Sequence, residues 1–252
     1  MINKYDASCV AIGNFDGIHI GHDTLIKRMI ALSREKNQNS IIITFKYVKK
    51  ELRKSTHNLK YINSFNTRML MLKSYDVTDI VEIELDDNIS KYTPEQFIKN
   101  ILIEKFNAKN IVVGYNFTFG YKAMGNINTL KEFESKYGYK VEEIPPVKFN
   151  GVAVSSTLVR TLLHEGKIHD ANSLLIHNYT IYFKDIYFDY NKNVGFVDNK
   201  SSIIIPLDGR YKVKIGNDEV WLTICTNKEG NIFTFNKEIE KNKDIIFISW
   251  WQ

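Results

Sequence analysis

Between residues 9 and 22 the chain runs Cys9-Val10-Ala11-Ile12-Gly13-Asn14-Phe15-Asp16-Gly17-Ile18-His19-Ile20-Gly21-His22, and this stretch decides the expected fold. Its apolar beginning predicts a short buried strand from Ser8 to Ile12, which Gly13 ends. Apolar residues then recur at helical spacing and predict a helix beginning near His22; they are Leu25, Ile26, Met29, Ile30 and Leu32. A strand, a glycine-rich turn and a helix N-terminus together favour anion binding, because glycines let the backbone approach a phosphate and the helix offers free N–H groups.

Two histidines three positions apart give this turn its chemical character. The glycine spacing differs from the dinucleotide-binding Gly-x-Gly-x-x-Gly pattern, and the Gly-Lys-Ser/Thr of a P-loop does not follow. His19-Ile20-Gly21-His22 resembles the His-x-Gly-His motif of nucleotidyltransferases, which implies imidazoles that point at ATP phosphates and stabilise charge as pyrophosphate leaves. The alternative is a pair of surface histidines in a turn. The strand before them, the glycines and the helix after them favour the functional interpretation.

The composition is that of an ordinary globular protein. The chain has 252 residues, 44% hydrophobic and 25% charged, enough for one large domain or two modest ones. A net charge of +5 suits anionic small molecules but is too weak to argue nucleic-acid binding. The charged run at residues 49–54 is interpreted as a solvated loop or helix face, and Cys9 and Cys225 as buried fillers rather than a disulfide. No run has the length of a membrane span, so we expect a cytoplasmic protein without nucleic-acid or membrane partners.

Strands and helices are expected to alternate as far as residue 144. Buried strands are predicted at 40–45, 79–84, 110–114 and 141–144. One helix is predicted at 65–75, a second begins at the capping box Thr93-Pro94-Glu95-Gln96, and a third ends at Gly138. This alternation predicts an α/β fold with a Rossmann-like, doubly wound parallel sheet. Ligands of such sheets lie beyond the carboxyl ends of the strands, and three predicted strands end at Gly13, Phe45 and Gly114.

Two further motifs follow. Gly114-Tyr115-Asn116-Phe117-Thr118-Phe119-Gly120 comes directly after a predicted strand, and its aromatic residues suit either a ligand pocket or the core. Val154-Ser155-Ser156-Thr157-Leu158-Val159-Arg160 places hydroxyls at a helix start and an arginine one turn later, which suits a triphosphate. An ordinary N-cap is the alternative for its serines.

Together the three motifs resemble the adenylyltransferase module of prokaryotic FAD synthetases, which carries Gly-x-Phe-Asp-Gly-x-His-x-Gly-His, Gly-x-Asp-Phe-x-Phe-Gly and Ser-Ser-Thr-x-x-Arg in this order. The resemblance covers roughly residues 8–176. It implies FMN adenylyltransferase activity, with ATP and FMN as substrates, FAD as product and Mg²⁺ as the metal, whose protein ligands the sequence does not reveal. It implies catalytic roles for His19, His22 and Arg160. The residues that it implies for ATP and phosphate binding are Gly13, Asn14, Phe15, Asp16, Gly17, Gly21, Asn116, Ser155, Ser156 and Thr157. Phe45, Tyr115 and Phe117 are candidates for the flavin pocket, with core packing as the alternative.

The sequence departs from the family pattern in two places. Asn116 replaces the usual Asp of the second motif, and Thr44-Phe45-Lys46-Tyr47-Val48-Lys49 replaces Thr-Phe-x-Pro-His-Pro, so the flavin-side loop differs. The expected acceptor is FMN, and the alternatives are another phosphorylated acceptor, such as nicotinate mononucleotide or pantetheine phosphate, or a non-catalytic flavin- or nucleotide-binding protein.

Near residue 177 the sequence changes from alternating strands and helices to short predicted strands, which predicts two domains, 1–176 and 177–252. The second is expected to be a small antiparallel β-barrel-like domain with strands at 180–183, 202–205, 210–215, 220–225, 232–235 and 245–250. Pro206-Leu207-Asp208-Gly209-Arg210-Tyr211 resembles the Leu-Pro-x-x-Gly-x-Tyr strand of the riboflavin kinase domain in that family. Its Gly-Arg-x-Leu-Gly and Pro-Thr-x-Asn motifs are missing from the sequence, so we expect no riboflavin kinase activity.

Overall fold

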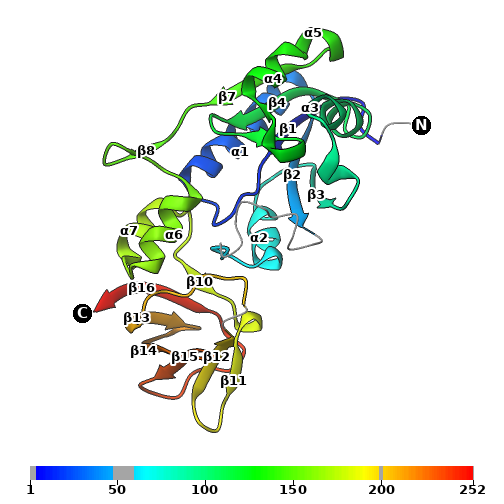
Figure 1. The fold of residues 1–252 in the computed structure, drawn as a ribbon. Helices are drawn as coiled ribbons and strands as arrows, with labels where there is room; N and C mark the ends of the chain where they lie inside the picture. Colours follow the sequence, from blue (N-terminus) through cyan, green and yellow to red (C-terminus); the bar gives the residue numbers. More distant parts are fainter. Residues whose placement is uncertain (1–3, 48–59, 199–200, 252) are drawn as a thin grey trace. The chain divides into compact units, whose positions relative to one another are not determined.

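The computed structural model describes residues 4–47, 60–198 and 201–251 of the chain. These residues form two compact units, which Figure 1 colours along the sequence. Among the described residues, unit 1 comprises 4–15, 21–47 and 70–147, and unit 2 comprises 16–20, 60–69, 148–198 and 201–251. Each unit therefore draws on segments far apart in sequence. The expected boundary between residues 176 and 177 stays a prediction, because these units are not continuous stretches of chain.

Unit 1 is built on a five-stranded parallel sheet. Its strands are β1 (Ser8–Ile12), β2 (Asn39–Tyr47), β3 (Asp79–Leu85), β4 (Ala108–Gly114) and β7 (Lys140–Ile144). They lie in the order β3-β2-β1-β4-β7, and every neighbouring pair is parallel. The strand order therefore reverses between β1 and β4, and ligands of such sheets bind outside the carboxyl ends of the strands at such a reversal. The predicted α/β doubly wound sheet is confirmed.

Helices connect these strands near the predicted positions. α1 (Ile20–Lys36) joins β1 to β2, and α2 (Phe65–Leu72) precedes β3. α3 (Pro94–Phe97) continues as a π-helical segment (Ile98–Ile103) before β4, and α4 (Ile127–Glu132) and α5 (Glu134–Tyr137) precede β7. The predicted capping box is present, since the Gln96 N–H donates to the Thr93 hydroxyl and the Thr93 N–H donates to the Gln96 side chain. Gly138, in the left-handed conformation, ends α5 as predicted.

The core of unit 1 lies against the sheet. All five residues of β1 are buried, and the inner strands β2 and β4 contribute further isoleucines and valines, as expected of a parallel sheet covered on both faces. Apolar side chains from the α3 region complete this core: Phe97, Ile98, Ile101, Leu102 and Phe106. The rigid sheet thereby fixes where β1 and β4 end.

Unit 2 joins two helices to a seven-stranded antiparallel sheet, seen as a curled half-barrel in Figure 1. A hairpin of β8 (Lys148–Phe149) and β9 (Val152–Ala153) leads into α6 (Ser156–His164) and α7 (Ile168–Leu174). The sheet has the order β10-β16-β13-β14-β15-β12-β11. Its strands are β10 (Thr180–Ile181), β11 (Tyr187–Asp189), β12 (Val194–Asp198), β13 (Gly209–Ile215), β14 (Asp218–Thr226), β15 (Gly230–Phe235) and β16 (Ile245–Trp251). Helices and sheet share one core, in which Val159 and Leu174 join Tyr211, Leu222 and Phe247.

Some expectations for the C-terminal strands are wrong. Residues 202–205 were expected to form a strand, but among them only Ile203 makes an isolated bridge, to Tyr61. The segment 180–183 is a strand only at 180–181, and a 3₁₀ turn (Phe183–Asp185) follows. β11 and β12 were missed, because β11 has three residues and Gly195 interrupts the apolar pattern of the five-residue β12.

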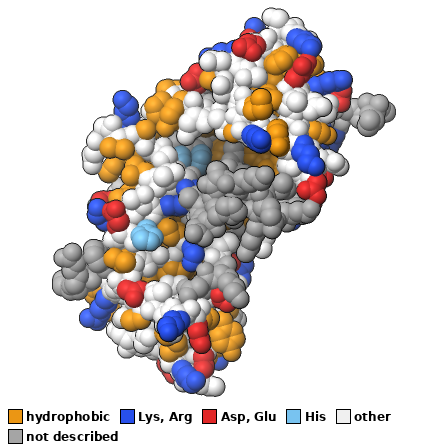
Figure 2. Space-filling model, in the orientation of Figure 1, with side chains coloured by type: hydrophobic (Ala, Val, Ile, Leu, Met, Phe, Trp, Pro, Cys, Tyr) orange, Lys and Arg blue, Asp and Glu red, His pale blue; other side chains and the backbone are white. Residues whose placement is uncertain are grey.

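The surface charge, the cysteines, the membrane-span expectation and the charged run can also be compared with the structure. Figure 2 shows Lys and Arg side chains interspersed with Asp and Glu, which fits the small net charge of +5. Cys9 is buried, but Cys225 is exposed, because it lies on the outward face of β14 between the buried Ile224 and the exposed Thr226; the expectation that both are buried is wrong for Cys225. Within the described part of the chain no helix has the length and apolar character needed to span a bilayer. The charged run at 49–54 lies outside the described residues.

Candidate active site

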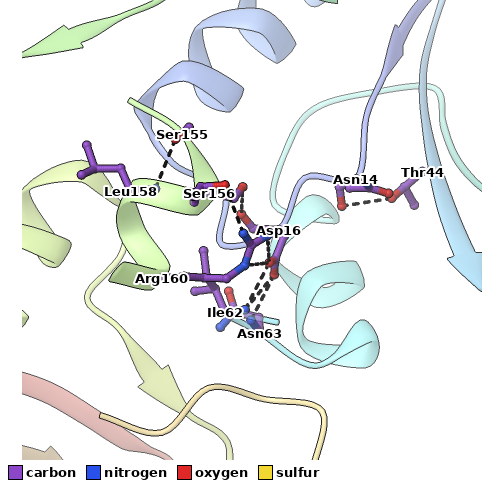
Figure 3. A network of polar contacts seen from close by, with 10 residues as sticks. Asn14, Asp16, Thr44, Ile62, Asn63, Ser155, Ser156, Leu158 and Arg160 are labelled. Carbon is purple, nitrogen blue, oxygen red and sulfur yellow. Dashed lines mark hydrogen bonds and ion pairs between the residues drawn. The ribbon is translucent and has the colours of Figure 1, made fainter. Parts of the chain in front are cut away.

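The first motif leaves the carboxyl end of β1 as a tight turn. In unit 1, the Gly13 N–H donates to the carbonyl of Ile43 at 3.1 Å, and the Thr44 hydroxyl donates to the Asn14 carbonyl at 3.4 Å (Figure 3). These contacts hold the start of the turn against β2. Because Asn14 and its neighbours lie at the edge where the strand order reverses, the turn stands where a parallel sheet binds its ligands.

Phe15 is a structural residue of this turn. Its side chain is fully buried, and its ring meets that of His22 edge-on with the centroids 5.3 Å apart. Its φ is +50°, an uncommon conformation for a bulky residue, which persists only where the surroundings impose it. Phe15 can therefore contact a ligand only through its backbone. Gly21 and the half-buried His22 lie in the first turn of α1.

Asp16 is the centre of a buried polar network in unit 2. Its carboxylate is 2% exposed and accepts hydrogen bonds from Arg160 Nε at 3.3 Å and Nη2 at 3.1 Å (Figure 3). It also accepts the backbone N–H groups of Ile62, at 3.0 Å, and Asn63, at 3.3 Å. Burial raises the pKa of the Asp16 carboxyl above its usual value, while the Arg160 charge and the two amides oppose that change. The network ties the first motif to the third.

The next residues of the turn need unusual backbone. Gly17 has a φ of +80°, and a Cβ at this position would lie 2.7 Å from Ile62 Cδ1. Only glycine meets both conditions, because a side chain would be strained by the φ and would clash with Ile62. Ile18 adopts a φ of +37° although it is fully buried. Strain of this kind gathers at functional sites, so it supports a site at this turn.

His19 is buried and uncharged at neutral pH. Its side chain is nearly enclosed, and its backbone forms an antiparallel bridge to Leu175, beside the hydrogen bond from the Ile176 N–H to the Ile18 carbonyl. Burial lowers the pKa of His19 to about 4, and the Arg160 guanidinium acts in the same direction. An imidazole in this state carries one N–H donor and no charge.

The third motif begins α6 and completes the network. The Ser155 hydroxyl accepts the Leu158 N–H at 3.2 Å, so Ser155 is the N-cap and the structural alternative for it is confirmed. The Ser156 hydroxyl donates to the Asp16 carbonyl at 2.9 Å (Figure 3). Arg160 Nη1 donates to the Thr157 hydroxyl at 3.5 Å. In unit 2, therefore, the fold brings the first and third motifs into direct contact.

The second motif follows β4 in unit 1. The Tyr115 N–H donates to Ile144 and the Phe117 N–H to Gly114, and both Tyr115 and Asn116 are exposed. Phe117 is half-buried and its ring stacks on that of Phe119, 5.5 Å away at 12°. Phe119 in turn meets Phe97, which also lies near the half-buried Phe45. Of the three flavin candidates, Tyr115 is open to solvent, whereas Phe45 and Phe117 belong to this aromatic cluster.

Sequence reasoning missed the segment that holds Asp16 from its other side. Ile62 and Asn63 are buried and contribute backbone amides, which leave no signature in sequence. Arg68 is also buried, lies over the rings of Tyr61 and Phe65, and adds positive charge near Asp16. Arg68 is the one charged residue of α2, and this was the signal that the sequence offered.

A magnesium ion has no protein cage in the described ranges. No group of three or more His, Cys, Asp or Glu side chains is arranged to hold a metal there. Asp16, the carboxylate of the first motif, is already surrounded by Arg160 and two amides, so the residues present do not fit a directly bound ion.

Comparison with known proteins agrees with the motifs. The family model described as FAD synthetase matches residues 2–158. A bifunctional riboflavin kinase/FMN adenylyltransferase of Buchnera aphidicola subsp. Schizaphis graminum is 34% identical over 96% of this chain and 84% of its own length. An FAD synthetase of Listeria monocytogenes is 27% identical over 83% of this chain and 82% of its own length.

A solved structure supports the fold. The crystal structure titled macrolide-efflux protein from Streptococcus pneumoniae matches 98% of this chain and 87% of its own with a TM-score of 0.78. Its sequence is 19% identical, so this likeness speaks for the fold alone. The family model and the Buchnera relative carry the assignment: the chain belongs to the FAD synthetase family and is a nucleotidyltransferase.

Proposed function

We propose that the chain is an FMN adenylyltransferase, which transfers AMP from ATP to FMN and releases pyrophosphate. The observation that carries this proposal is the hydrogen-bonded pair of the buried Asp16 and the half-buried Arg160, which joins the glycine-rich turn to α6. The names of the Buchnera and Listeria relatives support FMN as the acceptor and FAD as the product.

The reaction needs positioning and charge stabilisation more than covalent chemistry. A phosphate oxygen of FMN attacks the α-phosphorus of ATP, the new P–O bond forms, and the bond to the β-phosphate breaks as pyrophosphate leaves. The FMN phosphate is already ionised near neutral pH, so no general base is required. The contribution of the protein is to hold donors in place before the charge develops.

We assign the donors as follows. Asp16 fixes the plane of the Arg160 guanidinium, so that this cation is held in position before ATP arrives. His19 acts as a neutral N–H donor to a phosphate oxygen, because its pKa of about 4 leaves it uncharged in the free protein. His22, in the first turn of α1, donates together with the helix N-terminus.

The remaining ligand contacts are also proposals. Backbone groups of residues 13–17 and Gly21 approach the triphosphate, with the hydroxyls of Ser156 and Thr157 beside it, while the Ser155 hydroxyl caps α6. The exposed Asn116 contacts the nucleotide, and Tyr115 is the flavin contact that the structure leaves most accessible. Magnesium comes with ATP as part of the substrate, and no step is assigned to it.

We also propose that the chain has no riboflavin kinase activity. The segment that resembles the kinase strand has a structural use here, because the Asp208 carboxylate accepts both the N–H and the hydroxyl of Thr226 on β14. The sequence has neither Gly-Arg-x-Leu-Gly nor Pro-Thr-x-Asn.

The test is incubation of the full chain with ATP, Mg²⁺ and FMN, with FAD separated by chromatography and pyrophosphate measured. We expect FAD, and about a hundredfold lower turnover in Arg160→Lys, which keeps the charge but loses the planar contact with Asp16. The matched control is Arg34→Lys on α1, an exposed arginine paired with Asp76, which should leave turnover unchanged.

Parallel reactions separate the alternatives. Pyrophosphate release with nicotinate mononucleotide or pantetheine phosphate, but not with FMN, would assign another acceptor. No release with any acceptor would assign a binding protein without catalysis. Formation of FMN from riboflavin and ATP would contradict the proposed absence of kinase activity.

A further inference from the structure

We propose that the C-terminal β-region positions the Asp16–Arg160 pair through Tyr179, and that Tyr179 is a positioning residue for ATP. This inference rests on the proposed function and adds a role for the part of the chain that lacks the kinase motifs. All the residues that carry it belong to unit 2.

The first link is the backbone at 61–63. Asp16 is held by the amides of Ile62 and Asn63 as well as by Arg160. The Ile62 side chain is 1% exposed and packs directly against Gly17, where a Cβ would lie 2.7 Å from it. The position of this short segment therefore sets the position of the Asp16 carboxylate and, through it, of the Arg160 guanidinium.

The second link ties that segment to the stretch before β13. The Tyr61 N–H donates to the carbonyl of Ser202 at 2.6 Å, and the Ile204 N–H donates to the carbonyl of Tyr61 at 2.7 Å. Tyr61 and Ile203 thereby form a parallel bridge. Two backbone hydrogen bonds around one residue fix its direction as well as its place, so Ile62 and Asn63 follow the 202–204 stretch.

The third link is the side chain of Tyr179. Its hydroxyl donates to the carbonyl of Ile204, and the residue is 1% exposed. Its own backbone is anchored on two sides, by its N–H to Asn172 Oδ1 at 2.7 Å and by the Phe247 N–H to its carbonyl at 2.8 Å. Its ring also packs on that of Phe247, with the centroids 5.4 Å apart. Tyr179 thus connects α7 and β16 to the 202–204 stretch.

These links form one continuous path from β16 to the glycine-rich turn. Tyr179, Ile204 and Ile62 are buried and Tyr61 is half-buried, and hydrogen bonds join Tyr179 to Ile204, Ile204 to Tyr61 and Ile62 to Asp16. A weaker hydrogen bond at Tyr179 therefore loosens the backbone that holds Asp16. The sheet that the sequence marks as a reduced kinase domain becomes a support for the adenylyltransferase site.

The test compares Tyr179→Phe with Tyr211→Phe. Both substitutions remove one buried tyrosine hydroxyl that donates to a backbone carbonyl in the same unit. The Tyr211 hydroxyl donates to the Leu207 carbonyl four residues before it, whereas the Tyr179 hydroxyl donates to Ile204, which is itself bonded to Tyr61; Tyr211→Phe is therefore the matched control. Thermal unfolding of both variants measures their general loss of stability.

We expect Tyr179→Phe to raise KM for ATP by about three- to tenfold, the effect of one weakened hydrogen bond, with kcat reduced by less than about twofold. Amide exchange at Ile62 and Asn63 should accelerate by a similar factor. Tyr211→Phe should change neither the KM for ATP nor the amide exchange at Ile62 and Asn63, although its loss of melting temperature should be comparable.

Equal KM values for ATP in the two variants, or unchanged amide exchange at Ile62 and Asn63 in Tyr179→Phe, would overturn the inference. Failure of the wild-type chain to make FAD is a separate result, which would refute the proposed function. The exchange measurement would still decide, without any activity, whether Tyr179 holds the segment that binds Asp16.

Discussion

The buried His19 should make the stability of the protein depend on pH, and His19→Gln should remove that dependence. In the folded chain the pKa of this imidazole is about 4, whereas in the unfolded chain it returns to 6.5. Between these two pH values His19 is protonated in the unfolded state but neutral in the folded state. The contribution of the neutral His19 to the free energy of unfolding is therefore fully present above pH 6.5 and is lost as the pH falls towards 4.

The size of the effect follows from the same two values. A pKa that falls from 6.5 to about 4 corresponds to about 3 kcal/mol, since one pKa unit is about 1.4 kcal/mol. Asp16 acts in the opposite direction, because burial raises the pKa of its carboxyl and the folded state takes up its proton first on acidification. Asp16 is present in both proteins, so the difference between wild type and His19→Gln isolates the histidine.

Urea unfolding at a series of pH values from 7 to 4 measures this difference. All three tryptophans lie in strands of unit 2, the unit that contains His19, so their fluorescence follows the relevant transition. The wild type should lose about 3 kcal/mol more than His19→Gln over this range. The control is His169→Gln, an exposed position on α7, which should behave as the wild type. Equal pH dependence in wild type and His19→Gln would refute the reasoning.

Three further changes test the rest of the site by urea or thermal unfolding. Asp16→Asn should lower the free energy of unfolding by about 2 kcal/mol, because it removes the charge-assisted hydrogen bonds between Asp16 and the half-buried Arg160; no loss would contradict this. Gly17→Ala should destabilise the chain by more than Gly138→Ala, since both have positive φ but only the first Cβ meets a neighbouring side chain; equal losses would show that the close contact is unimportant. Ser155→Ala should cost about 1 kcal/mol as the loss of an N-cap, and no loss would remove that assignment.

The sequence by itself determined much of unit 1. Its strands are short apolar runs bounded by glycine or polar residues, and its helices carry local signals such as the Thr93 capping box and the Gly138 stop, so both follow from neighbouring residues. The order of the three motifs also lay in the sequence, and with it the family. Where strands were short and interrupted, as in β11 and β12, local pattern was too weak to find them.

Only the tertiary structure decided what the motif residues do within the fold. The family resemblance implied ATP or phosphate binding for Asp16, and the fold shows that its carboxylate accepts hydrogen bonds from Arg160 and from the amides of Ile62 and Asn63, which lie more than forty positions away. Phe15 resembled part of a ligand loop, but its ring is enclosed. Burial and backbone partners depend on which distant segments meet, and a backbone N–H is the same at every residue except proline, so no local pattern of side chains specifies them.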